Sequence, residues 1–261
     1  MYNYIYTFGG KTIKVSHGIQ IEVGAANRKN FVYPLHDDTG DNISAQNEYY
    51  GELTGMYWVW KNTQIADDDI IGFSHYNKAL NISNTKAEKW IKDHDYYGII
   101  SLSPIAIRNH PAQDEVTAVL EILQDKFKDE YRVWQILYDE EAASVGCTCR
   151  GGNIFITSGK IFKDYCRWLF CVLSEMRKKV GDKPYIDSYM RRYCAYMGER
   201  LLAVYIESQK IPAKGVSMKY KKWWIPILGK IRRSIGISRD TSLYKRLYDM
   251  LGAKSQYGKR L

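Results

Sequence analysis

Apolar residues along the chain form short runs that alternate with longer segments of helical spacing. The short runs span residues 4–8, 19–23, 70–76, 97–102 and 152–156. Residues 19–23 alternate as I-Q-I-E-V, which is typical of a half-buried strand, whereas 70–76 and 97–102 are apolar enough for buried strands. The pattern therefore predicts a parallel or mixed β-sheet.

Apolar positions that recur at intervals of three and four predict the helices between these strands. In residues 48–62 they are Tyr49, Leu53, Met56, Tyr57 and Trp60. Further helices are predicted over 86–92, 113–126, 159–179 and 185–208. Strands that alternate with helices favour an α/β sandwich, in which ligands lie beyond the carboxyl ends of the strands. No apolar run reaches the roughly 18 residues that a membrane-spanning helix needs.

Length and composition fit one folded α/β domain with a short extension, because the chain has 261 residues of which 45% are hydrophobic. Five cysteines, an odd number, follow a short polar N-terminus that lacks the features of a secretory signal. We therefore expect a cytoplasmic protein. A structural zinc site at Cys147 and Cys149 is disfavoured, because no second pair of ligands follows at suitable spacing.

Positive charge is concentrated at the end of the chain. Residues 214–261 contain thirteen Lys or Arg and two Asp, a net charge of +11, whereas the whole chain carries +9. Residues 1–213 are therefore nearly neutral, and the two parts are expected to have different partners. The sequence predicts a globular domain over 1–213 and a basic, partly helical segment over 214–261.

The basic segment also contains the paired Trp223 and Trp224, with apolar and cationic residues on both sides. Tryptophan suits the headgroup level of a bilayer and basic residues are attracted to anionic lipid, so the segment is predicted to bind a membrane surface. A helix that packs against the domain is the alternative. Nucleic acid is disfavoured as a partner, since no known DNA- or RNA-binding module accompanies the charge.

The first candidate site is the loop that contains Asp37, Asp38, Asp41 and Asn42. Carboxylates and an amide in one loop can bind the hydroxyls of a sugar, or a divalent cation that carries phosphates. The alternative is a solvated turn in which Ser44 caps the following helix.

The second candidate site follows the run 70–76, where His75, Tyr76 and Lys78 mark the carboxyl end of a predicted strand. Lys78 is suited to hold a diphosphate as a point charge. Asn153 follows two glycines, which allow backbone and amide to approach a ligand closely. The alternative for His75 is a structural histidine with its hydrogen bonds satisfied.

Arg192 and Glu199 are seven residues apart and share one face of a continuous helix. A carboxylate beside arginines is either a salt-bridge partner or, in a cleft, a general base that deprotonates a substrate hydroxyl. The guanidinium then stabilises a leaving phosphate. Glu199 is the first candidate for this base and Asp187 the second.

Five segments in this order resemble the DUF4422 family: 37–44 (DDTGDNIS), 47–62 (NEYYGELTGMYWVWKN), 71–78 (IGFSHYNK), 152–156 with 165–173 (GNIFI, YCRWLFCVL) and 198–202 (GERLL). Members of that family are bacterial glycosyltransferases encoded with capsular and exopolysaccharide pathways, and some are associated with galactofuranose transfer. The resemblance runs from about residue 19 to 205. It implies a GT-A-like nucleotide-sugar-binding sandwich, a nucleotide-sugar donor such as a UDP sugar, and a lipid-linked glycan acceptor.

The donor-binding residues that follow from the matching segments and the candidate sites are Lys11, Asp37, Asp38, Asp41, Asn42, Glu52, Lys61, His75, Tyr76, Lys78, Asn153 and Arg192. The family pattern H-Y-R-R-Y-F reads H-Y-N-K-A-L at 75–80 of this chain, so one arginine is lost and Lys78 replaces the other. Lysine is a point charge where arginine is a fork, which predicts a change in donor affinity or identity. The family also tends to have His-Lys after its first strand, and only Lys11 remains here.

Many GT-A enzymes hold Mg²⁺ or Mn²⁺ with an Asp-x-Asp at the end of a central strand, whereas this strand ends in His75-Tyr76-Asn77. Asp67, Asp68 and Asp69 precede the strand and are expected at its opposite end. Either a cation is held elsewhere with help from His75, or Lys78 and arginines neutralise the leaving diphosphate.

The expected function is transfer of a sugar from a nucleotide donor to a lipid-linked or glycan acceptor, in capsular, exopolysaccharide or O-antigen synthesis, at the cytoplasmic face of the cell membrane. The alternative is a non-catalytic glycan-binding or partner subunit with a degenerate GT-A fold, which the altered residues 75–80 favour. The presence together of Asp37, Glu52, Asn153 and Glu199 favours an active enzyme.

Overall fold

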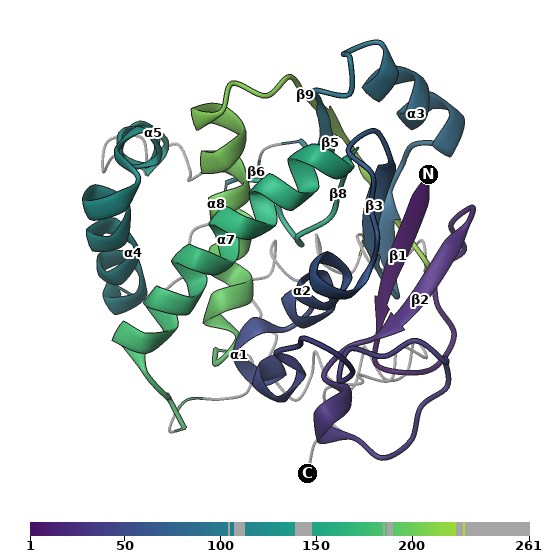
Figure 1. Cartoon of the computed structure of the whole chain (residues 1–261), viewed down its shortest axis with the longest axis horizontal. Helices are drawn as coiled ribbons and strands as arrows, with labels where there is room; N and C mark the ends of the chain where they lie inside the picture. Colours follow the sequence, from purple (N-terminus) through teal and green to yellow (C-terminus); the bar gives the residue numbers. More distant parts are fainter. Residues whose placement is uncertain are drawn as a thin grey trace.

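The structure is a computed structural model that describes residues 1–103, 105–106, 113–138, 148–184, 186, 190–222 and 227. Within these residues an eight-stranded mixed sheet forms the centre of the molecule (Figure 1). Its strands are β1 (Tyr2–Thr7), β2 (Gly18–Glu22), β3 (Ile70–His75), β4 (Lys78–Leu80), β5 (Ile99–Leu102), β8 (Phe155–Ser158), β9 (Ala213–Val216) and β10 (Met218–Tyr220). A separate two-stranded sheet joins β6 (Ile105–Ala106) to β7 (Thr148–Cys149).

The strand order brings the carboxyl ends of most strands to one end of the sheet. β1 lies between β2 and β3 and is parallel to both. β8 runs antiparallel to β3 on one side and to β5 on the other, so that β5 again points the same way as β3. β9 pairs with β5 in parallel, and the short β4 folds back from the end of β3 to pair with β10. The sheet is mixed, as the apolar runs indicated.

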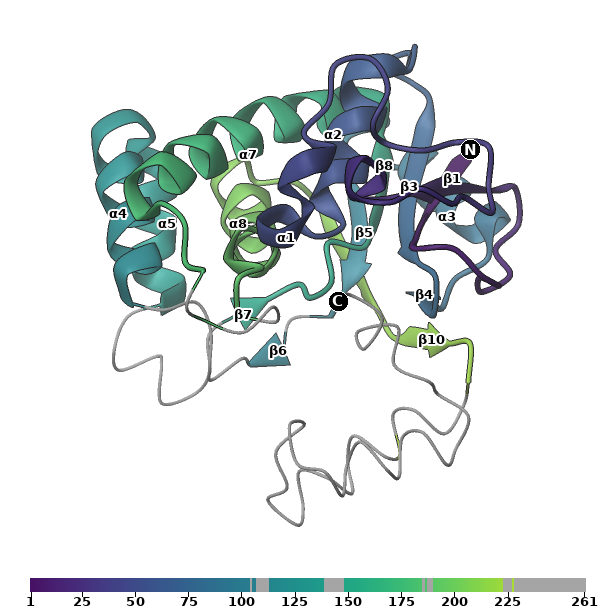
Figure 2. The same cartoon turned by 90° about the horizontal axis from the view of Figure 1, so that it is seen from below.

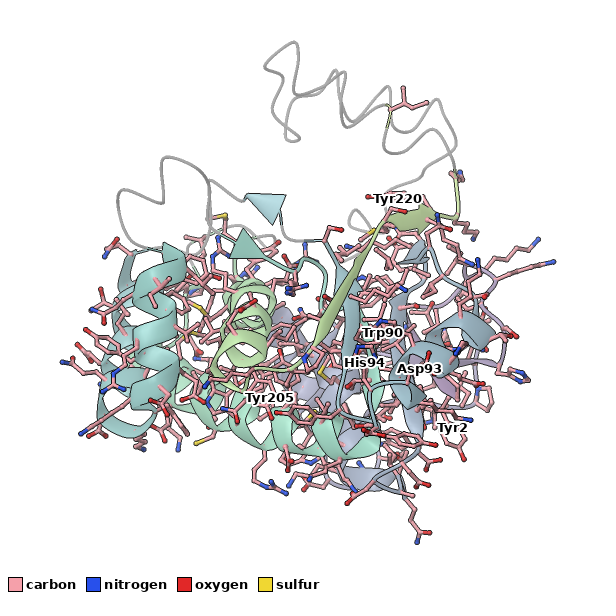
Figure 3. The ribbon with its side chains drawn as sticks, turned by 90° about the horizontal axis from the view of Figure 1, so that it is seen from above. Tyr2, Trp90, Asp93, His94, Tyr205 and Tyr220 are labelled. Carbon is pink, nitrogen blue, oxygen red and sulfur yellow. The ribbon has the colours of Figure 1, made fainter. Side chains whose placement is uncertain are left out.

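Helices cover both faces of the sheet. They are α1 (Asn47–Tyr50), α2 (Leu53–Asn62), α3 (Asn84–Lys92), α4 (Gln113–Lys126), α5 (Lys128–Tyr138), α7 (Gly159–Val180) and α8 (Tyr193–Ser208), with short 3-10 helices η1 (Ala25–Asn27) and η2 (Ser44–Gln46). The larger apolar core lies between the sheet and α2, α7 and α8, and α4 and α5 pack on its outer side (Figure 2). A smaller core lies on the other face, where Ala87 and Ile91 of α3 pack on the strands. At the end of α3, the ring of His94 packs against Trp90 (Figure 3).

The longest helix, α7, shows how local sequence sets the limits of an element. Ser158 ends β8, and its hydroxyl accepts a hydrogen bond from Ile161 N–H, which caps the first turn. The last turn is basic, which suits the negative end of the helix dipole. Gly181 then adopts φ 72°, a conformation that a side chain disfavours, and the helix stops.

The predicted helix over 48–62 is broken in two at Gly51. This residue adopts φ 53° and ψ −130°, and the side chain of Asn47 donates a hydrogen bond of 2.6 Å to its carbonyl oxygen. The side-chain bond replaces a helical partner at this carbonyl. The break was missed because the apolar spacing continues across it, and its effect is to place Glu52 at the start of α2.

The end of the chain differs from its sequence-based description in two ways. The helix predicted over 185–208 begins only at Tyr193. Residues 213–220 form β9 and β10 and belong to the sheet, so the domain boundary that we placed after residue 213 falls inside β9. Short strands such as these have too few residues to show an alternating pattern. The helices α3, α4 and α7 are confirmed, and α5 was not predicted.

The three aspartates before β3 lie at the opposite end of that strand from His75, as expected. The carbonyl of Asp69 accepts a hydrogen bond from Gly159 N–H at the start of α7, and Asp67 contacts Lys163.

In the part of the chain that the structure describes, no helix has the length and apolar character needed to cross a bilayer.

Candidate functional site

Six polar residues from five segments meet at the carboxyl end of β3, and we call them the polar cluster: Glu52, His75, Lys78, Asn153, Arg192 and Glu199. Glu52 begins α2, His75 ends β3 and Lys78 opens β4. Asn153 lies in the turn before β8, and α8 contributes the other two. All six were candidates from the sequence, where more than 140 residues separate the first from the last.

The polar cluster is held together by the amide of Asn153. Its Nδ2 donates to Glu52 Oε1 at 2.8 Å and to the carbonyl oxygen of Ala195 at 3.1 Å. Asn153 is fully buried and adopts φ 48°, a left-handed conformation that asparagine tolerates better than most residues. A side chain at Gly198 would approach Asn153 Oδ1 to 3.0 Å, so the glycine allows α8 to pack here.

The hairpin between β3 and β4 places His75 and Lys78 beside the same turn. The two residues are paired across the hairpin, and His75 Nε2 lies 2.6 Å from the carbonyl oxygen of Gly152. Gly152 adopts φ 84°, and a side chain there would come within 2.9 Å of Lys78 Nζ. The glycine therefore provides both the backbone conformation and the space for the lysine.

His75 is neutral at physiological pH. Burial, with the positive charge of Lys78 nearby, lowers its pKa to about 4. A carbonyl oxygen only accepts hydrogen bonds, so Nε2 carries the proton that bonds Gly152 and Nδ1 is left as an acceptor. Glu52 Oε1 lies 3.7 Å from Nε2. The histidine thus positions the glycine turn and keeps one basic nitrogen.

The two carboxylates of the polar cluster have opposite acid–base character. Burial tends to raise the pKa of Glu52, but the neighbouring imidazole of His75, the Asn153 hydrogen bond and the charge of Lys78 outweigh it, so this pKa is lowered. Burial raises the pKa of Glu199, and repulsion from Glu52 adds to the effect against the attraction of Lys78. Glu52 is therefore a fixed charge, whereas Glu199 is the carboxyl suited to exchange a proton.

Asp37, by contrast, has a structural role. Its carboxylate is fully buried and accepts hydrogen bonds from Gly24 N–H and Ala25 N–H, each at 3.0 Å, and from the Ser44 hydroxyl. These contacts tie the turn after β2 to η2. The carboxylate therefore holds the loop together and has its hydrogen bonds inside the fold.

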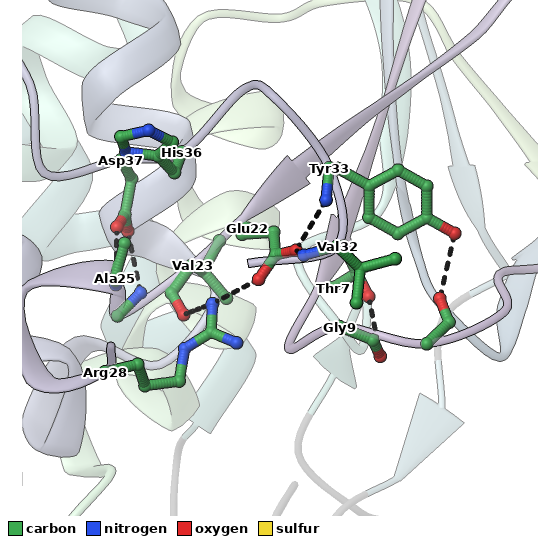
Figure 4. A network of polar contacts seen from close by, with 12 residues as sticks. Thr7, Gly9, Glu22, Val23, Ala25, Arg28, Val32, Tyr33, His36 and Asp37 are labelled. Atoms are coloured by element: carbon green, nitrogen blue, oxygen red, sulfur yellow. Dashed lines mark hydrogen bonds and ion pairs between the residues drawn. The ribbon is translucent and has the colours of Figure 1, made fainter. Parts of the chain in front are cut away.

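A second buried carboxylate, Glu22, supports the same loop (Figure 4). Its Oε1 accepts from the N–H groups of Val32 and Tyr33, and its Oε2 forms an ion pair of 2.8 Å with Arg28. The Tyr33 hydroxyl donates to the carbonyl of Gly10 at 2.8 Å, which connects this loop to the end of β1. The sequence suggested only a strand end here, because a glutamate in an alternating strand is normally exposed.

The other candidates from the loop lie away from the polar cluster. Asp41 accepts from the Tyr57 hydroxyl at 3.0 Å and lies 3.7 Å from Lys61 Nζ, near the end of α2. Ten residues of helix separate this end from Glu52, a distance of about 15 Å. Asp38 contacts His36, and the side chain of Asn42 bonds within its own turn. These residues therefore do not join Glu52 and His75.

Lys11 and Tyr76 lie in neighbouring segments beside β4. The carbonyl oxygen of Tyr76 accepts a hydrogen bond of 2.7 Å from Ile13 N–H, and Lys221 Nζ donates to the carbonyl of Lys11. Both stay candidates for donor binding. Asp187 lies outside the described residues, and so does all of the basic segment after Lys222 except Ile227.

Tyr6 is a residue of the site that the sequence did not reveal. Its ring contacts the imidazole of His75 edge-on at 5.9 Å between centroids, and its hydroxyl is buried without a hydrogen-bond partner in the described chain. In the sequence, Tyr6 is distinguished only by an inward-facing position on β1, which any tyrosine of the apolar core would share.

No group of three His, Cys, Asp or Glu side chains that could hold a metal ion occurs among the described residues. The carboxylates of Glu52 and Glu199 lie instead beside cationic groups, with Lys78 acting on both. Among the described residues of the polar cluster, Lys78 and Arg192 are the ones whose positive charge can offset that of a bound anion.

Comparison with known proteins places the chain in a family. Residues 9–210 match DUF4422, described as a domain of unknown function. The chain belongs to the DUF4422 family. No curated protein matches it.

This DUF4422 chain is also similar to a solved structure described as the apo form of the bifunctional glycosyltransferase WbbM. The TM-score is 0.70 at 22% identity, and the match covers 84% of this chain and 45% of that chain. The chain thus spans less than half the length of the protein that it resembles. The likeness shows the fold, which is mixed α/β and GT-A-like, as the sequence predicted.

The structural role of Asp37 can be tested by Asp37→Ala. The substitution leaves two buried N–H groups and the Ser44 hydroxyl without an acceptor, so the free energy of unfolding is expected to fall by about 2–3 kcal/mol in urea titrations. The matched control is Asp38→Ala, which removes a half-exposed contact with His36 and is expected to cost less than about 1 kcal/mol. Equal stability of the two variants would contradict the assignment.

Proposed function

We propose that this protein is a nucleotide-sugar-dependent glycosyltransferase whose reaction centre is the polar cluster. The observation that carries the proposal is the meeting of six polar residues from distant segments at the carboxyl end of β3, in a GT-A-like fold. Sheets of this kind bind ligands at that end. The structure described as a glycosyltransferase shares the fold, which supports the same chemical class.

The donor we propose is a UDP sugar, with UDP-galactofuranose as the first to test because the resemblance to the DUF4422 family implies it. Lys78 and Arg192 bind the diphosphate and offset its charge. Arg192 lies at the N-terminus of α8, where the helix dipole also favours an anion. We propose a hexosyl transfer to a lipid-linked or glycan acceptor of a capsular, exopolysaccharide or O-antigen pathway.

In the proposed reaction Glu199 removes the proton from the acceptor hydroxyl. The raised pKa of its carboxyl makes it a stronger base than an exposed glutamate, while Glu52 remains a fixed negative charge beside His75. The oxygen of the acceptor then attacks the anomeric carbon, and the bond from that carbon to the diphosphate breaks. Lys78 and Arg192 stabilise the negative charge that develops on the leaving UDP.

Lys78→Ala is expected to weaken UDP binding about 10- to 100-fold in calorimetry, because one charge-assisted contact to the diphosphate is lost. The matched control is Lys61→Ala, which removes the same charge near the other end of α2, beside Asp41. It is expected to leave affinity unchanged. If Lys61→Ala weakens UDP binding and Lys78→Ala does not, the donor binds at the loop of Asp41 and the proposed centre is contradicted.

Glu199→Gln is expected to reduce turnover about 10²–10⁴-fold while UDP affinity is retained, because an amide fits the space but accepts no proton. In the parent protein the rate rises with pH through the raised pKa of Glu199, since only the ionised form is a base, and the variant lacks this limb. Turnover is followed as UDP release from the donor that stabilises the protein most in a thermal-shift panel of UDP, GDP and TDP sugars.

Glu207→Gln is the matched control for this experiment. Glu207 lies on the same helix, and its carboxylate contacts Arg150 at 3.8 Å. The turnover of the Glu207→Gln variant is expected to equal that of the parent protein. Full activity of Glu199→Gln would assign Glu199 a structural role, and UDP-sugar binding without any turnover in the parent protein would favour a non-catalytic subunit.

We further propose that the basic segment 214–261 holds the enzyme at the cytoplasmic face of a membrane, near a lipid-linked acceptor. Its net charge of +11, of which +7 lies after Lys222, and the pair Trp223 and Trp224 support this location. Basic residues near an anionic bilayer gain roughly 1 kcal/mol each, and salt screens this attraction. Residues 214–220 contribute to strands β9 and β10 of the sheet, so the anchor itself is assigned to the residues after Lys222.

The intact chain is expected to sediment with anionic vesicles at low salt and to be released as salt rises. A chain shortened after Lys222 keeps β10 and is expected to stay in the supernatant while it still binds UDP. Replacing Trp223 and Trp224 by alanine is expected to remove the salt-resistant part of the binding. Equal sedimentation of the intact and shortened chains would show that the anchor lies elsewhere.

A further inference from the structure

A polar cavity of about 320 Å³ lies on the face of the sheet opposite to the polar cluster. Ser74 lines it, and its neighbour His75 belongs to the polar cluster; successive side chains of a strand point to opposite faces. The other polar residues that line the cavity come from the N-terminus of α3, from β10 and from the segments around β1 and β2. They include Asn3, Ser16, Ser83, Thr85 and Lys219.

Ser74 is the observation that points to a ligand. The residue is 5% exposed, and its hydroxyl lines the cavity without a hydrogen-bond partner in the described chain. Asn3, which is 3% exposed, lies on the same wall, and its Nδ2 donates to the carbonyl of Ser16 at 2.8 Å. The wall is thus a fixed surface of hydroxyl and amide groups.

The opening of the cavity is positively charged. The hydroxyl of Ser83 caps α3 by accepting from Lys86 N–H at 3.4 Å, while the N–H groups of Asn84 and Thr85, in the first turn, have no carbonyl acceptor within the helix. A second hollow of about 390 Å³ shares Ser83 and Lys219 with the cavity and adds the side chain of Lys86. No carboxylate occurs among the described residues that line either space. A helix N-terminus between two lysines favours an anion.

We propose that this cavity is a second ligand site, which binds the phosphate monoester of a small polyol. The phosphate lies at the N-terminus of α3 between Lys86 and Lys219, and the polyol hydroxyls extend to Ser74 and Asn3. The separation of charge at the opening from neutral polar groups at the wall matches a ligand with one charged end. The site does not depend on the proposed glycosyltransferase reaction.

The site is connected to the polar cluster through the sheet. Lys219 on β10 pairs with Ala79 on β4, and the next residue of β10, Tyr220, pairs with Lys78. Tyr220 lies at the end of β10 (Figure 3). The strand that closes the cavity thus also supports the lysine that we assign to the donor.

Calorimetry on the full chain tests the site, with glycerol 3-phosphate, inorganic phosphate and glycerol as probes. Glycerol 3-phosphate is expected to bind saturably and more tightly than inorganic phosphate, because it adds hydroxyl contacts at the wall. Glycerol alone is expected to give no saturable heat, since it lacks the charge. Absence of saturable binding of both anions would overturn the proposal.

Variants locate the binding. Ser74→Ala is expected to weaken glycerol 3-phosphate binding about 3- to 10-fold without unfolding the protein, because its hydroxyl makes no bond in the fold. Lys219→Ala is expected to weaken binding about 10-fold or more. Lys92→Ala is the matched control, since it removes one charge at the far end of α3. Unchanged affinity in Ser74→Ala and Lys219→Ala would overturn the assignment.

Lys78→Ala separates this site from the donor site. It is expected to weaken UDP binding and to leave glycerol 3-phosphate binding intact. If both affinities fall together, the phosphate ester binds at the polar cluster and the second site is contradicted. If UDP fails to bind the parent protein while glycerol 3-phosphate binds, the proposed function fails and the second site stands.

Discussion

The hydrogen bonds of the Asn153 amide are the constraint on which the candidate centre depends. One nitrogen donates both to Glu52 at the start of α2 and to the backbone of Ala195 on α8, so a single buried group fixes two helices to the turn before β8. Because the amide is fully buried, losing either acceptor leaves a polar group unsatisfied in a place that water does not reach. Two features of the backbone allow this arrangement. Gly198 leaves space for α8 to pack beside Asn153, and the helix break at Gly51 places Glu52 at the start of α2.

Electrostatics within the polar cluster follow from the same geometry. A neutral His75 bonded to Gly152 adds no charge, so Lys78 and Arg192 face Glu52 and Glu199 in a site of balanced charge. Glu52 is stabilised as an anion by its hydrogen bond and its cationic neighbours, which leaves Glu199 as the carboxyl with a raised pKa. Two glutamates of one chemical type thus acquire different roles from burial and neighbours alone.

The two faces of the sheet differ in a way that a single strand makes clear. On β3, His75 belongs to the polar cluster, while Ser74 lines the cavity beside α3. The face toward α2, α7 and α8 is filled by large aromatic and aliphatic side chains, and the polar cluster lies at its carboxyl end. The α3 face has a smaller apolar core, so space remains between α3 and the strands.

The sequence by itself determined the α/β class, the central strands and the helices α3, α4 and α7, and it singled out the six residues of the polar cluster as separate candidates. Apolar positions recur every 2 residues in a strand and every 3.6 in a helix because each element buries one face. A long element therefore shows its type in its own sequence. Only the tertiary structure decided which candidates work together. Asp37 looked like a ligand-binding carboxylate and is a buried structural acceptor, while Lys61 matched the family but lies at the far end of α2 from Glu52. Hydrogen bonds such as that of Asn153 to Glu52 join residues about a hundred positions apart, and no local pattern encodes them.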